Sequence, residues 1–255
     1  MPNLLILGGT REASALAGAV AQAGLSATLS YAGRVARPRA QPIPLRVGGF
    51  GGPEGLAGYL AAQGVTHLVD ATHPFAAQMS RNAVAAAAQA GIPLAALTRP
   101  PWAPGPGDRW QRVADIPGAV AVLAVPPRRV MLAVGRMHLA AFAAQPQHRY
   151  LLRLVDRPEG ALPLPDAEVV VDRGPFTEAG DRALMARHGI ELVVAKNAGG
   201  DGARAKIDAA RALGLPVLMI DRPALPPRTE LATPRAVLDW VAHTHAAPSG
   251  AERGV

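Results

Sequence analysis

Basic and hydroxyl side chains follow several predicted strands, and these residue types can hold anions and move protons. The turn Gly8-Gly9-Thr10 comes first, His73 lies in a later turn, and Lys196 follows a strand in the second half. In parallel α/β sheets the carboxyl ends of the strands form the edge that binds ligands. These positions therefore predict binding and proton transfer at sheet edges.

The first turn partly fits the dinucleotide fingerprint G-x-G-x-x-G/A. Gly8 holds the first place, Thr10 replaces the second glycine, and Ala13 stands at the third. Gly8 permits a tight turn, and the amides of the helix beginning near Arg11 are expected to face a pyrophosphate, to which Thr10 can donate its hydroxyl hydrogen. With Gly9, these residues predict a cofactor site. A plain strand-to-helix turn is the alternative.

The end of the second predicted strand favours NADPH over NADH. An NAD site usually has an acidic residue there for the ribose 2′-hydroxyl, but residues 30–34 contain none. Ser30 and Arg34 are instead expected to bind a 2′-phosphate, with Arg37 and Arg39 in the same loop. For each arginine alone, the alternative is solvated surface charge.

The turn Asp70-Ala71-Thr72-His73-Pro74 follows the fourth predicted strand. Pro74 suits the first position of a helix, which makes Thr72 or His73 the expected cap. As a ligand site, the turn would line the nicotinamide pocket, with His73 as proton donor or orienting group. Capping alone is the alternative.

The second half contains a lysine loop. Lys196-Asn197-Ala198-Gly199-Gly200 follows a predicted strand, and its small residues would let a ligand reach the backbone amides of an anion-binding nest. A flexible glycine loop with a solvated lysine is the alternative. Arg136 and Arg222 also follow strands, and a structural turn explains Arg222 equally well.

The elements that position these residues alternate between strand and helix. Apolar runs predict strands at residues 4–7, 27–30, 45–47, 68–70, 94–97, 110–113, 130–133, 150–154, 169–171, 192–195 and 217–220. Helical periodicity predicts helices after residue 10, near 54–63, 76–90 and 234–243, and centred near 120, 140, 183 and 208. We therefore expect an α/β fold of two Rossmann-like, doubly wound parallel-sheet halves with a cleft between them.

The Pro/Gly-rich segment 99–107 divides these halves. The expected organisation is an NADPH-binding Rossmann-like domain at 1–98, a substrate-binding α/β domain at 99–245 and a disordered tail at 246–255.

Composition narrows the function classes. The 255 residues carry 26 basic and 19 acidic side chains, and aromatic residues make up 4%, too few for base-stacking platforms. A polyanionic small substrate explains the charge better than nucleic acid does, although a G+C-rich genome would also favour arginine. Cysteine is absent and the histidines show no metal-ligand spacing, so no metal site is expected.

No uninterrupted apolar run is long enough to cross a membrane, and the N-terminus lacks the basic region of a signal peptide. We expect a cytoplasmic protein, either a monomer or a weak homo-oligomer.

Taken together, these segments resemble the precorrin-6A reductase family, including its cobalt-precorrin-6A members. The resemblance covers nearly the whole chain in family order. It rests on residues 6–13, 70–76, 99–102, 173–176 and 196–200, on Lys206, Ala209 and Ala210, and on Arg222-Pro223. Two places depart from the family pattern: Ala198 replaces a serine, and Val134 replaces a threonine before Gly135. Asn197 and backbone amides are the expected stand-ins for the serine.

The resemblance implies an NADPH-dependent oxidoreductase of cobalamin biosynthesis that reduces a double bond of precorrin-6A to give precorrin-6B. His73 and Lys196 are the expected catalytic residues, with His73, Lys196 or water as proton donor. The residues expected to bind the carboxylates of this tetrapyrrole are Arg99, Arg136, Arg173, Lys196, Asn197, Gly199, Gly200 and Arg222.

Two alternatives remain open at this point. One is an NADP-dependent reductase of another acidic substrate, which would leave the lysine loop without a purpose. The other is a non-catalytic NADP(H)-sensing protein, which would bind NADPH tightly and turn nothing over.

Overall fold

The computed structural model describes residues 1–32, 40–154, 156, 158, 160–172 and 174–246. Its strands are β1 Asn3–Leu7, β2 Ser26–Tyr31, β3 Leu45–Val47, β4 His67–Asp70, β5 Leu94–Leu97, β6 Arg109–Val113, β7 Arg129–Ala133, β8 Arg149–Leu154, β9 Ala167–Val171, β10 Leu192–Lys196, β11 Pro216–Ile220 and β12 Thr229–Leu231. Its helices are α1 Arg11–Gln22, α2 Pro53–Ala62, α3 Ala77–Ala90, α4 Ile116–Val122, the 3₁₀ helix η1 Arg136–Ala144, α5 Glu178–Arg187, α6 Ala205–Ala212 and α7 Pro234–Ala246.

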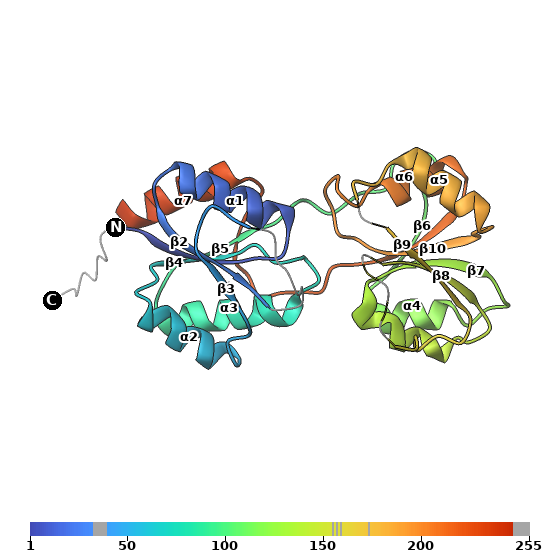
Figure 1. Cartoon of the computed structure of the whole chain (residues 1–255), viewed down its shortest axis with the longest axis horizontal. Coiled ribbons are helices and arrows are strands. Elements are labelled where there is room, and N and C mark those ends of the chain that lie inside the picture. Colours follow the sequence, from blue (N-terminus) through green and yellow to red (C-terminus); the bar gives the residue numbers. More distant parts are fainter. Residues whose placement is uncertain (33–39, 155, 157, 159, 173, 247–255) are drawn as a thin grey trace. The chain divides into compact units, whose positions relative to one another are not determined.

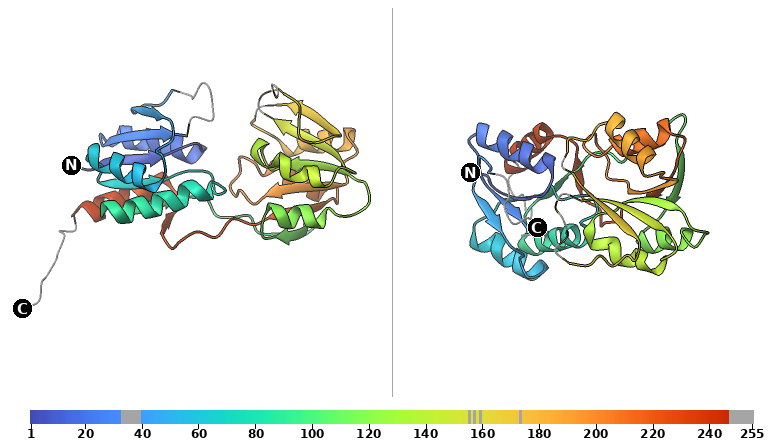
Figure 2. Two further views of the ribbon diagram at one scale, coloured as in Figure 1. Left: turned by 90° about the horizontal axis from the view of Figure 1, so that it is seen from below. Right: turned by 45° about the vertical axis from the view of Figure 1, so that its right-hand side comes forward.

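The first sheet has six parallel strands in the order β12-β5-β4-β1-β2-β3. Helices α1 and α7 cover one face and α2 and α3 cover the other (Figure 1; Figure 2). Read from β3, this is the 3-2-1-4-5-6 order of dinucleotide-binding sheets, with β12 in the sixth place.

The second sheet is also six-stranded and parallel, in the order β6-β11-β10-β7-β8-β9. Helices α5 and α6 cover one face, with α4 on the other (Figure 1). The expected helix near residue 140 is the 3₁₀ helix η1. The two parallel α/β sheets confirm the predicted fold class.

Local sequence explains strand β1 and helix α1, which flank the glycine turn of the first sheet. Strand β1 is buried on both faces, as a central parallel strand requires. Helix α1 buries the predicted apolar stripe of Ala13, Leu16, Ala17 and Val20. Gly24 follows its C-cap with a φ of +65°, a conformation that favours glycine.

The chain divides into two compact units that differ from the expected domains. The first contains Met1–Arg99 and Ala224–Val255, and the second contains Pro100–Pro223. The C-terminal segment, which we expected in the second domain, thus belongs to the first. Strand β12 pairs with β5, and α7 packs against α1. Sequence patterns missed β12 because it is a three-residue strand that follows a proline-rich run. Residues 247–255 of the expected tail lie outside the described residues.

Each sheet has one point where the chain reverses its direction of strand addition. In the first sheet it lies between β1 and β4, and in the second between β7 and β10. Ligands of open α/β sheets bind beyond the carboxyl ends of the strands at such switch points. The turn after β1, the turn after β4 and the lysine loop after β10 all occupy these places.

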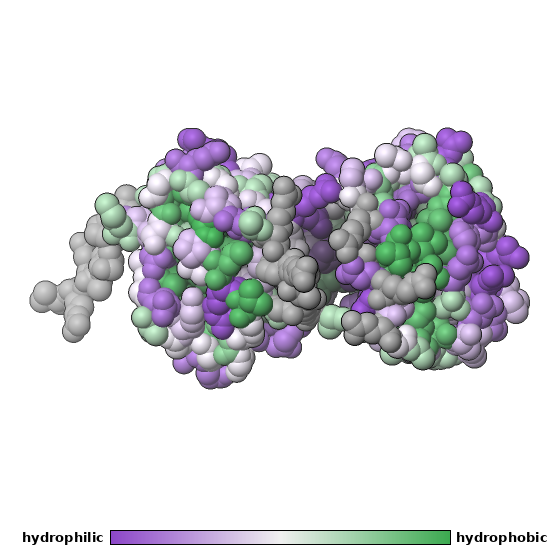
Figure 3. Space-filling view, in the orientation of Figure 1, coloured by the Kyte–Doolittle hydropathy of each residue, from purple (hydrophilic) through white to green (hydrophobic). Residues whose placement is uncertain are grey.

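The surfaces carry both polar and apolar residues. In the view of Figure 3, hydrophobic residues show at the surface of each unit between hydrophilic ones. Val47 on the edge strand β3 and Val171 at the end of β9 are among the large apolar side chains left exposed. In the described part of the chain no helix is long and apolar enough to span a bilayer.

Candidate functional site

The glycine turn after β1 has the geometry that the fingerprint predicts. The Gly8 amide donates to the Ser30 carbonyl at 2.8 Å, and a Cβ on Gly8 would come within 2.7 Å of the Leu29 side chain. Gly9 has a φ of +123°, which strains any other residue, and apart from its chain neighbours no atom of the described residues lies within 4 Å of the position its Cβ would take. The turn therefore brings backbone, without side chains, to the start of α1, where Arg11 is exposed.

Thr10 joins the two turns of the first switch point. As N-cap of α1 its hydroxyl oxygen accepts from the Ala13 amide at 3.1 Å, and the hydroxyl donates to the Ala71 carbonyl at 2.8 Å. The single hydroxyl hydrogen of Thr10 is directed at Ala71, and its expected donation to a pyrophosphate stays a prediction. Thr10 holds the turn after β1 against the turn after β4.

Asp70, at the end of β4, is buried and accepts four hydrogen bonds. Its Oδ1 accepts from the amide and hydroxyl of Thr72, at 3.1 and 2.6 Å. Its Oδ2 accepts from Ser80 and from Arg228, both at 2.6 Å. Arg228 comes from the segment before β12, and its side chain is only 7% exposed. Sequence reasoning missed this ion pair because nothing local links residues 158 positions apart.

The cap expected at Thr72 or His73 is wrong. Helix α3 begins only at Ala77, its N-cap is Ala76, and that cap makes no side-chain hydrogen bond. His73 Nδ1 accepts from the Phe75 amide at 3.2 Å, so a neutral imidazole in this arrangement carries its hydrogen on Nε2. His73 is half-buried at the switch point, where a proton donor is expected.

Ser30 meets a basic residue that sequence reasoning did not select. The parallel register of β2 and β3 sets Arg46 beside Ser30, and Arg46 Nη1 donates to Ser30 Oγ at 3.3 Å. Arg46 also donates to the carbonyls of Gly48 and Gly49, and its guanidinium lies 3.7 Å from the Phe50 ring centroid. Arg34 lies outside the described residues. Only the strand register places a cation beside Ser30, so the sequence offered no signal for Arg46.

Arg99 contacts helix α1 at the boundary of the first unit. Its guanidinium donates to Glu12 at 2.7 Å, and both side chains are partly buried. Burial raises the pKa of Glu12, but the hydrogen bond and charge of Arg99, together with hydrogen bonds from the Glu12 amide and Thr10, keep that pKa below its ordinary value. This pair gives Arg99 a partner within the first unit, and its expected contact with substrate stays a prediction.

The second switch point holds Lys196. Its Nζ would lie 3.9 Å from a Cβ on Gly135, so the side chain reaches toward the turn after β7. Burial lowers the pKa of Lys196 to about 8. Arg136 begins η1, is exposed, and donates to the Asp156 carbonyl at 3.2 Å. Arg173 lies outside the described residues.

The lysine loop is packed against the segment that enters the second unit. Asn197 is buried, and its side-chain oxygen and nitrogen both bond the Trp102 backbone, at 2.8 and 2.9 Å. Arg222 donates to the Asn197 and Ala198 carbonyls. A Cβ on Gly199 would collide with the Pro100 carbonyl and the Arg222 guanidinium. These contacts give Asn197, Gly199 and Arg222 packing partners within the unit, and their expected part in ligand binding stays a prediction.

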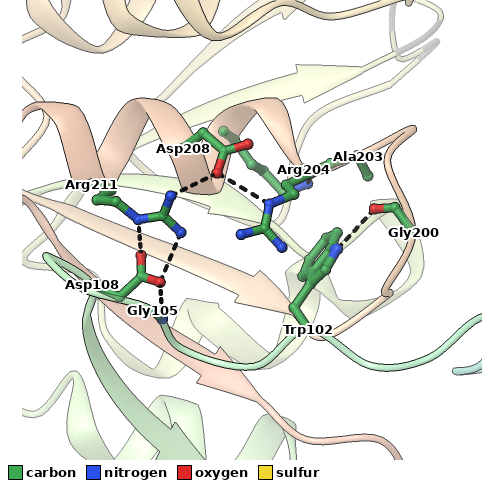
Figure 4. Close-up of polar contacts among 9 residues, drawn as sticks. Trp102, Gly105, Asp108, Gly200, Ala203, Arg204, Asp208 and Arg211 are labelled. Carbon is green, nitrogen blue, oxygen red and sulfur yellow. Dashed lines mark hydrogen bonds and ion pairs between the residues drawn. The ribbon is translucent and has the colours of Figure 1, made fainter.

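Gly200 belongs to the same packed loop. Its carbonyl accepts from the Trp102 indole N–H at 2.8 Å (Figure 4). The loop therefore fixes Trp102 by both its backbone and its ring.

A second lysine is buried beside this loop. Lys206, in the first turn of α6, is 7% exposed and donates to the Ala203 carbonyl at 2.6 Å. Its ammonium lies 5.5 Å from the Trp102 ring centroid. Nearby, Arg153 pairs with the buried Asp181, and its guanidinium lies 3.6 Å from the Phe176 ring centroid. Sequence reasoning gave Lys206 no role in the site.

The chain matches the family model described as precorrin-6x reductase CbiJ/CobK over residues 3–242. It belongs to the precorrin-6x reductase family. This membership confirms the resemblance drawn from the sequence motifs.

Relatives and a solved structure agree with that family. The precorrin-6A reductase of Rhodobacter capsulatus is 58% identical over 250 residues, covering 98% of this chain and all of that protein. The precorrin-6A reductase of Rhodococcus erythropolis is 49% identical, covering 94% of this chain and 98% of that one. A solved structure of CobK precorrin-6A reductase superposes with a TM-score of 0.90 at 58% identity, covering 98% and 100% of the two chains.

As a member of the precorrin-6x reductase family, the chain is a reductase of cobalamin biosynthesis. A reductase built on Rossmann-like sheets implies a nicotinamide cofactor, and the family implies a tetrapyrrole substrate.

Proposed function

We propose that the chain uses NADPH to reduce one carbon–carbon double bond of the precorrin-6A macrocycle, giving precorrin-6B. The first unit would hold the cofactor and the second would bind the polycarboxylated substrate. Its similarity to precorrin-6A reductases and the two switch points support this proposal. The remaining support comes from the residues of each site.

The single observation that carries the proposal is the glycine turn at the first switch point. Gly8 leaves no room for a side chain against Leu29, and Gly9 presents bare backbone at the N-terminus of α1. Helix N-termini favour phosphate through their amides and dipole. These residues fit the pyrophosphate of a dinucleotide.

The choice of NADPH is supported at the end of β2. Ser30 and Arg46 stand there beside each other, and the strand carries no acidic residue that would repel a 2′-phosphate. Arg46 uses both Nη1 hydrogens and one Nη2 hydrogen on protein acceptors, so a guanidinium with five donors has further capacity. We expect Arg46, with Arg34, to bind the 2′-phosphate.

When bound, NADPH supplies a hydride from nicotinamide C4. The protein contributes orientation, which lowers such barriers by up to about 7–11 kcal/mol in well-aligned reactions. His73, Lys196 or water would deliver the proton that completes the reduction. Arg136 and Arg173 remain candidates for binding substrate carboxylates, because charge-assisted hydrogen bonds from arginine suit such groups.

Anaerobic incubation with NADPH and precorrin-6A tests the proposal, following absorbance at 340 nm together with the visible spectrum of the macrocycle. Coupled changes in both are the expected result, with NADH giving a slower reaction. NADPH binding without turnover of either precorrin-6A or its cobalt form would contradict the proposal and favour a sensor of NADP(H).

Arg46→Met tests the cofactor assignment. We expect it to weaken NADPH at least tenfold while changing NADH little, since a charge-assisted hydrogen bond contributes about 1.5–3 kcal/mol. Arg235→Met, which removes an arginine that is 83% exposed on α7, is the matched control and should alter neither. Equal weakening of both cofactors would remove Arg46 from the 2′-phosphate site.

A further inference from the structure

The end of strand β4 carries a buried carboxylate that the proposed reaction does not use. Asp70 is paired with Leu7 in the parallel register, and Leu7 is paired with Ser30 on its other side. Neighbouring strands lie about 4.8 Å apart, so Asp70 is one strand away from the residue that precedes the glycine turn. The Thr10 hydroxyl, which donates to the Ala71 carbonyl at 2.8 Å, joins the two turns directly.

The strand register indicates where the nicotinamide half of a bound dinucleotide would lie. A dinucleotide crosses the switch point of such a sheet, with its pyrophosphate at the turn after the first strand. The residues proposed for the adenosine half, Ser30 and Arg46, lie on the β2 side of that turn. The nicotinamide half would therefore extend toward β4 and the turn of Asp70.

The hydrogen bonds at position 70 require a carboxylate rather than an amide. Asp70 Oδ1 accepts from the amide and hydroxyl of Thr72, and Oδ2 accepts from Ser80 and Arg228. An asparagine has one oxygen, and its NH₂ group would face the donors on the other side. Since Thr72 directly precedes His73, the carboxylate fixes the turn that carries His73.

A net charge at this place would change the relative affinity for the two forms of the cofactor. The nicotinamide ring is neutral in NADPH and positive in NADP⁺. An uncompensated carboxylate would therefore favour NADP⁺ by the Coulomb energy between the two charges. At an effective dielectric constant of about 20 and a separation of about 10 Å, that energy corresponds to a ratio of affinities of roughly 15-fold.

Arg228 supplies the compensating charge. Its Nη1 donates to Asp70 Oδ2 at 2.6 Å, and the two side chains are 7% and 2% exposed. Thr72 and Ser80 already give the carboxylate three neutral donors, so the guanidinium chiefly adds a positive charge. Arg228 also bonds Glu230, but that carboxylate is 57% exposed and screened by water.

Anchoring of the segment before β12 explains this ion pair less well. The segment is also held by Arg81, which donates to the Ala224 carbonyl at 3.2 Å, and by the Thr98 amide, which donates to the Leu231 carbonyl at 2.9 Å. Replacing a buried ion pair by apolar residues is often neutral or stabilising. Stability alone is therefore a poor reason for a buried pair of charges at the switch point.

We propose that Arg228 is a positioning residue of the nicotinamide site and acts through Asp70. The carboxylate orders the turn of Thr72 and His73, and Arg228 cancels its charge, so that the site does not retain NADP⁺ in preference to NADPH. This proposal rests on the proposed function, to which it adds selection between the two redox forms of the cofactor.

Isothermal titration of the full chain with NADPH and with NADP⁺, without substrate, tests this role. Arg228→Met leaves the Asp70 charge uncompensated, and three hydrogen bonds remain to keep the carboxylate ionised. We expect the affinity for NADP⁺ relative to NADPH to rise by about fivefold to twentyfold. Asp70→Asn leaves a positive charge instead, so the same ratio should fall, by a smaller factor because Glu230 remains beside Arg228.

A double variant and a matched control separate charge from packing. Asp70→Asn combined with Arg228→Met removes both charges and should return the ratio to within about twofold of the parent value. Together with Asp70→Asn it carries the test if Arg228→Met alone does not fold. Ser80→Ala removes a neutral donor from the same carboxylate oxygen, so any loss of affinity should be equal for the two cofactors.

The ratio of affinities decides the role of Arg228. Equal weakening of both cofactors in every variant would reduce Arg228 to a packing role and overturn the proposal. A shift in the same direction in Arg228→Met and Asp70→Asn would also overturn it. If the parent binds both cofactors but does not reduce precorrin-6A, the proposed reaction fails while the ratios still decide the role of Arg228. Failure of the parent to bind either cofactor would end both proposals.

Discussion

The two sheets share the arrangement of five strands but carry different switch points. In both, three consecutive strands extend in one direction (β1-β2-β3 and β7-β8-β9), and the next two strands extend in the other (β4-β5 and β10-β11). The first sheet follows its central strand β1 with a glycine turn and a capped twelve-residue helix, whereas the second follows β7 with Gly135 and an uncapped 3₁₀ helix. The same sheet architecture therefore places a helix N-terminus, which suits phosphate, at the switch point of the first unit. It places the Lys196 amine at the switch point of the second.

The sixth strand also differs between the units. The first sheet takes β12 from the end of the chain, and the second takes β6 from the segment just before its own first crossover. Each unit fixes its incoming segment by side chains beside its switch point, through Arg228 on Asp70 and through Asn197 on Trp102. The residues that anchor these segments thus lie at the turns that are expected to bind ligands.

The buried cation of the first unit should give the largest effect. Arg228→Met leaves Asp70 as a buried carboxylate without its charged partner, and we expect a loss of about 3–5 kcal/mol in the free energy of unfolding. Chemical denaturation measures it. Glu230→Ala removes the exposed partner of Arg228 instead and should cost less than about 1 kcal/mol. A small effect of Arg228→Met would mean that Thr72 and Ser80 satisfy Asp70 without it.

The buried cation of the second unit should behave in the opposite way. Among the described residues no carboxylate forms an ion pair with Lys206, so Lys206→Met should stabilise the protein at pH 7 by on the order of 1–3 kcal/mol. Its pKa falls from 10.5 to about 8 on folding, so the unfolded chain binds more protons between these values. The contribution of this group to stability therefore rises with pH across that window, and thermal denaturation between pH 7 and 10 should show the rise weakened in Lys206→Met. Destabilisation by the variant would contradict this balance.

Equivalent glycines should separate the ligands of the two units. Gly9 and Gly135 both follow central strands, with φ values of +123° and +83°, so alanine strains either backbone by about 1–3 kcal/mol. Gly9→Ala should also weaken NADPH about tenfold by displacing the phosphate-facing amides, while Gly135→Ala should leave NADPH binding intact. Isothermal titration measures both. Equal weakening by the two variants would break the assignment of the cofactor to the first unit.

The smallest expected difference concerns two helix caps. Thr10 and Thr177 each accept from a backbone amide at 3.1 Å, but Thr10 also donates to Ala71. Thr177→Val should cost about 1 kcal/mol of stability, and Thr10→Val about 1 kcal/mol more for the extra hydrogen bond. Denaturation midpoints compare them, and equal costs would show that the Ala71 contact adds nothing.

Much of the site's location could be predicted from sequence because it follows from local patterns. Strand bounds such as 45–47 and 94–97 are reproduced in full, and the turns after β1, β4 and β10 lie where the apolar runs end. Parallel strands then bring those turns to switch points. The contacts within the turns were less predictable. Thr10 and Asn197 form hydrogen bonds with residues distant in sequence, and Gly199 packs against such residues.

The sequence by itself determined two α/β units, the glycine turn and the family motifs, since these depend on periodicity, turn chemistry and residue type along short segments. Only the tertiary structure decided that β12 and α7 return to the first unit, that Arg46 lies beside Ser30, and that Lys206 is buried against the Trp102 ring. The physical reason is that strand register, ion pairing and burial join residues far apart in the chain, so their energies are set by contacts that no local pattern contains.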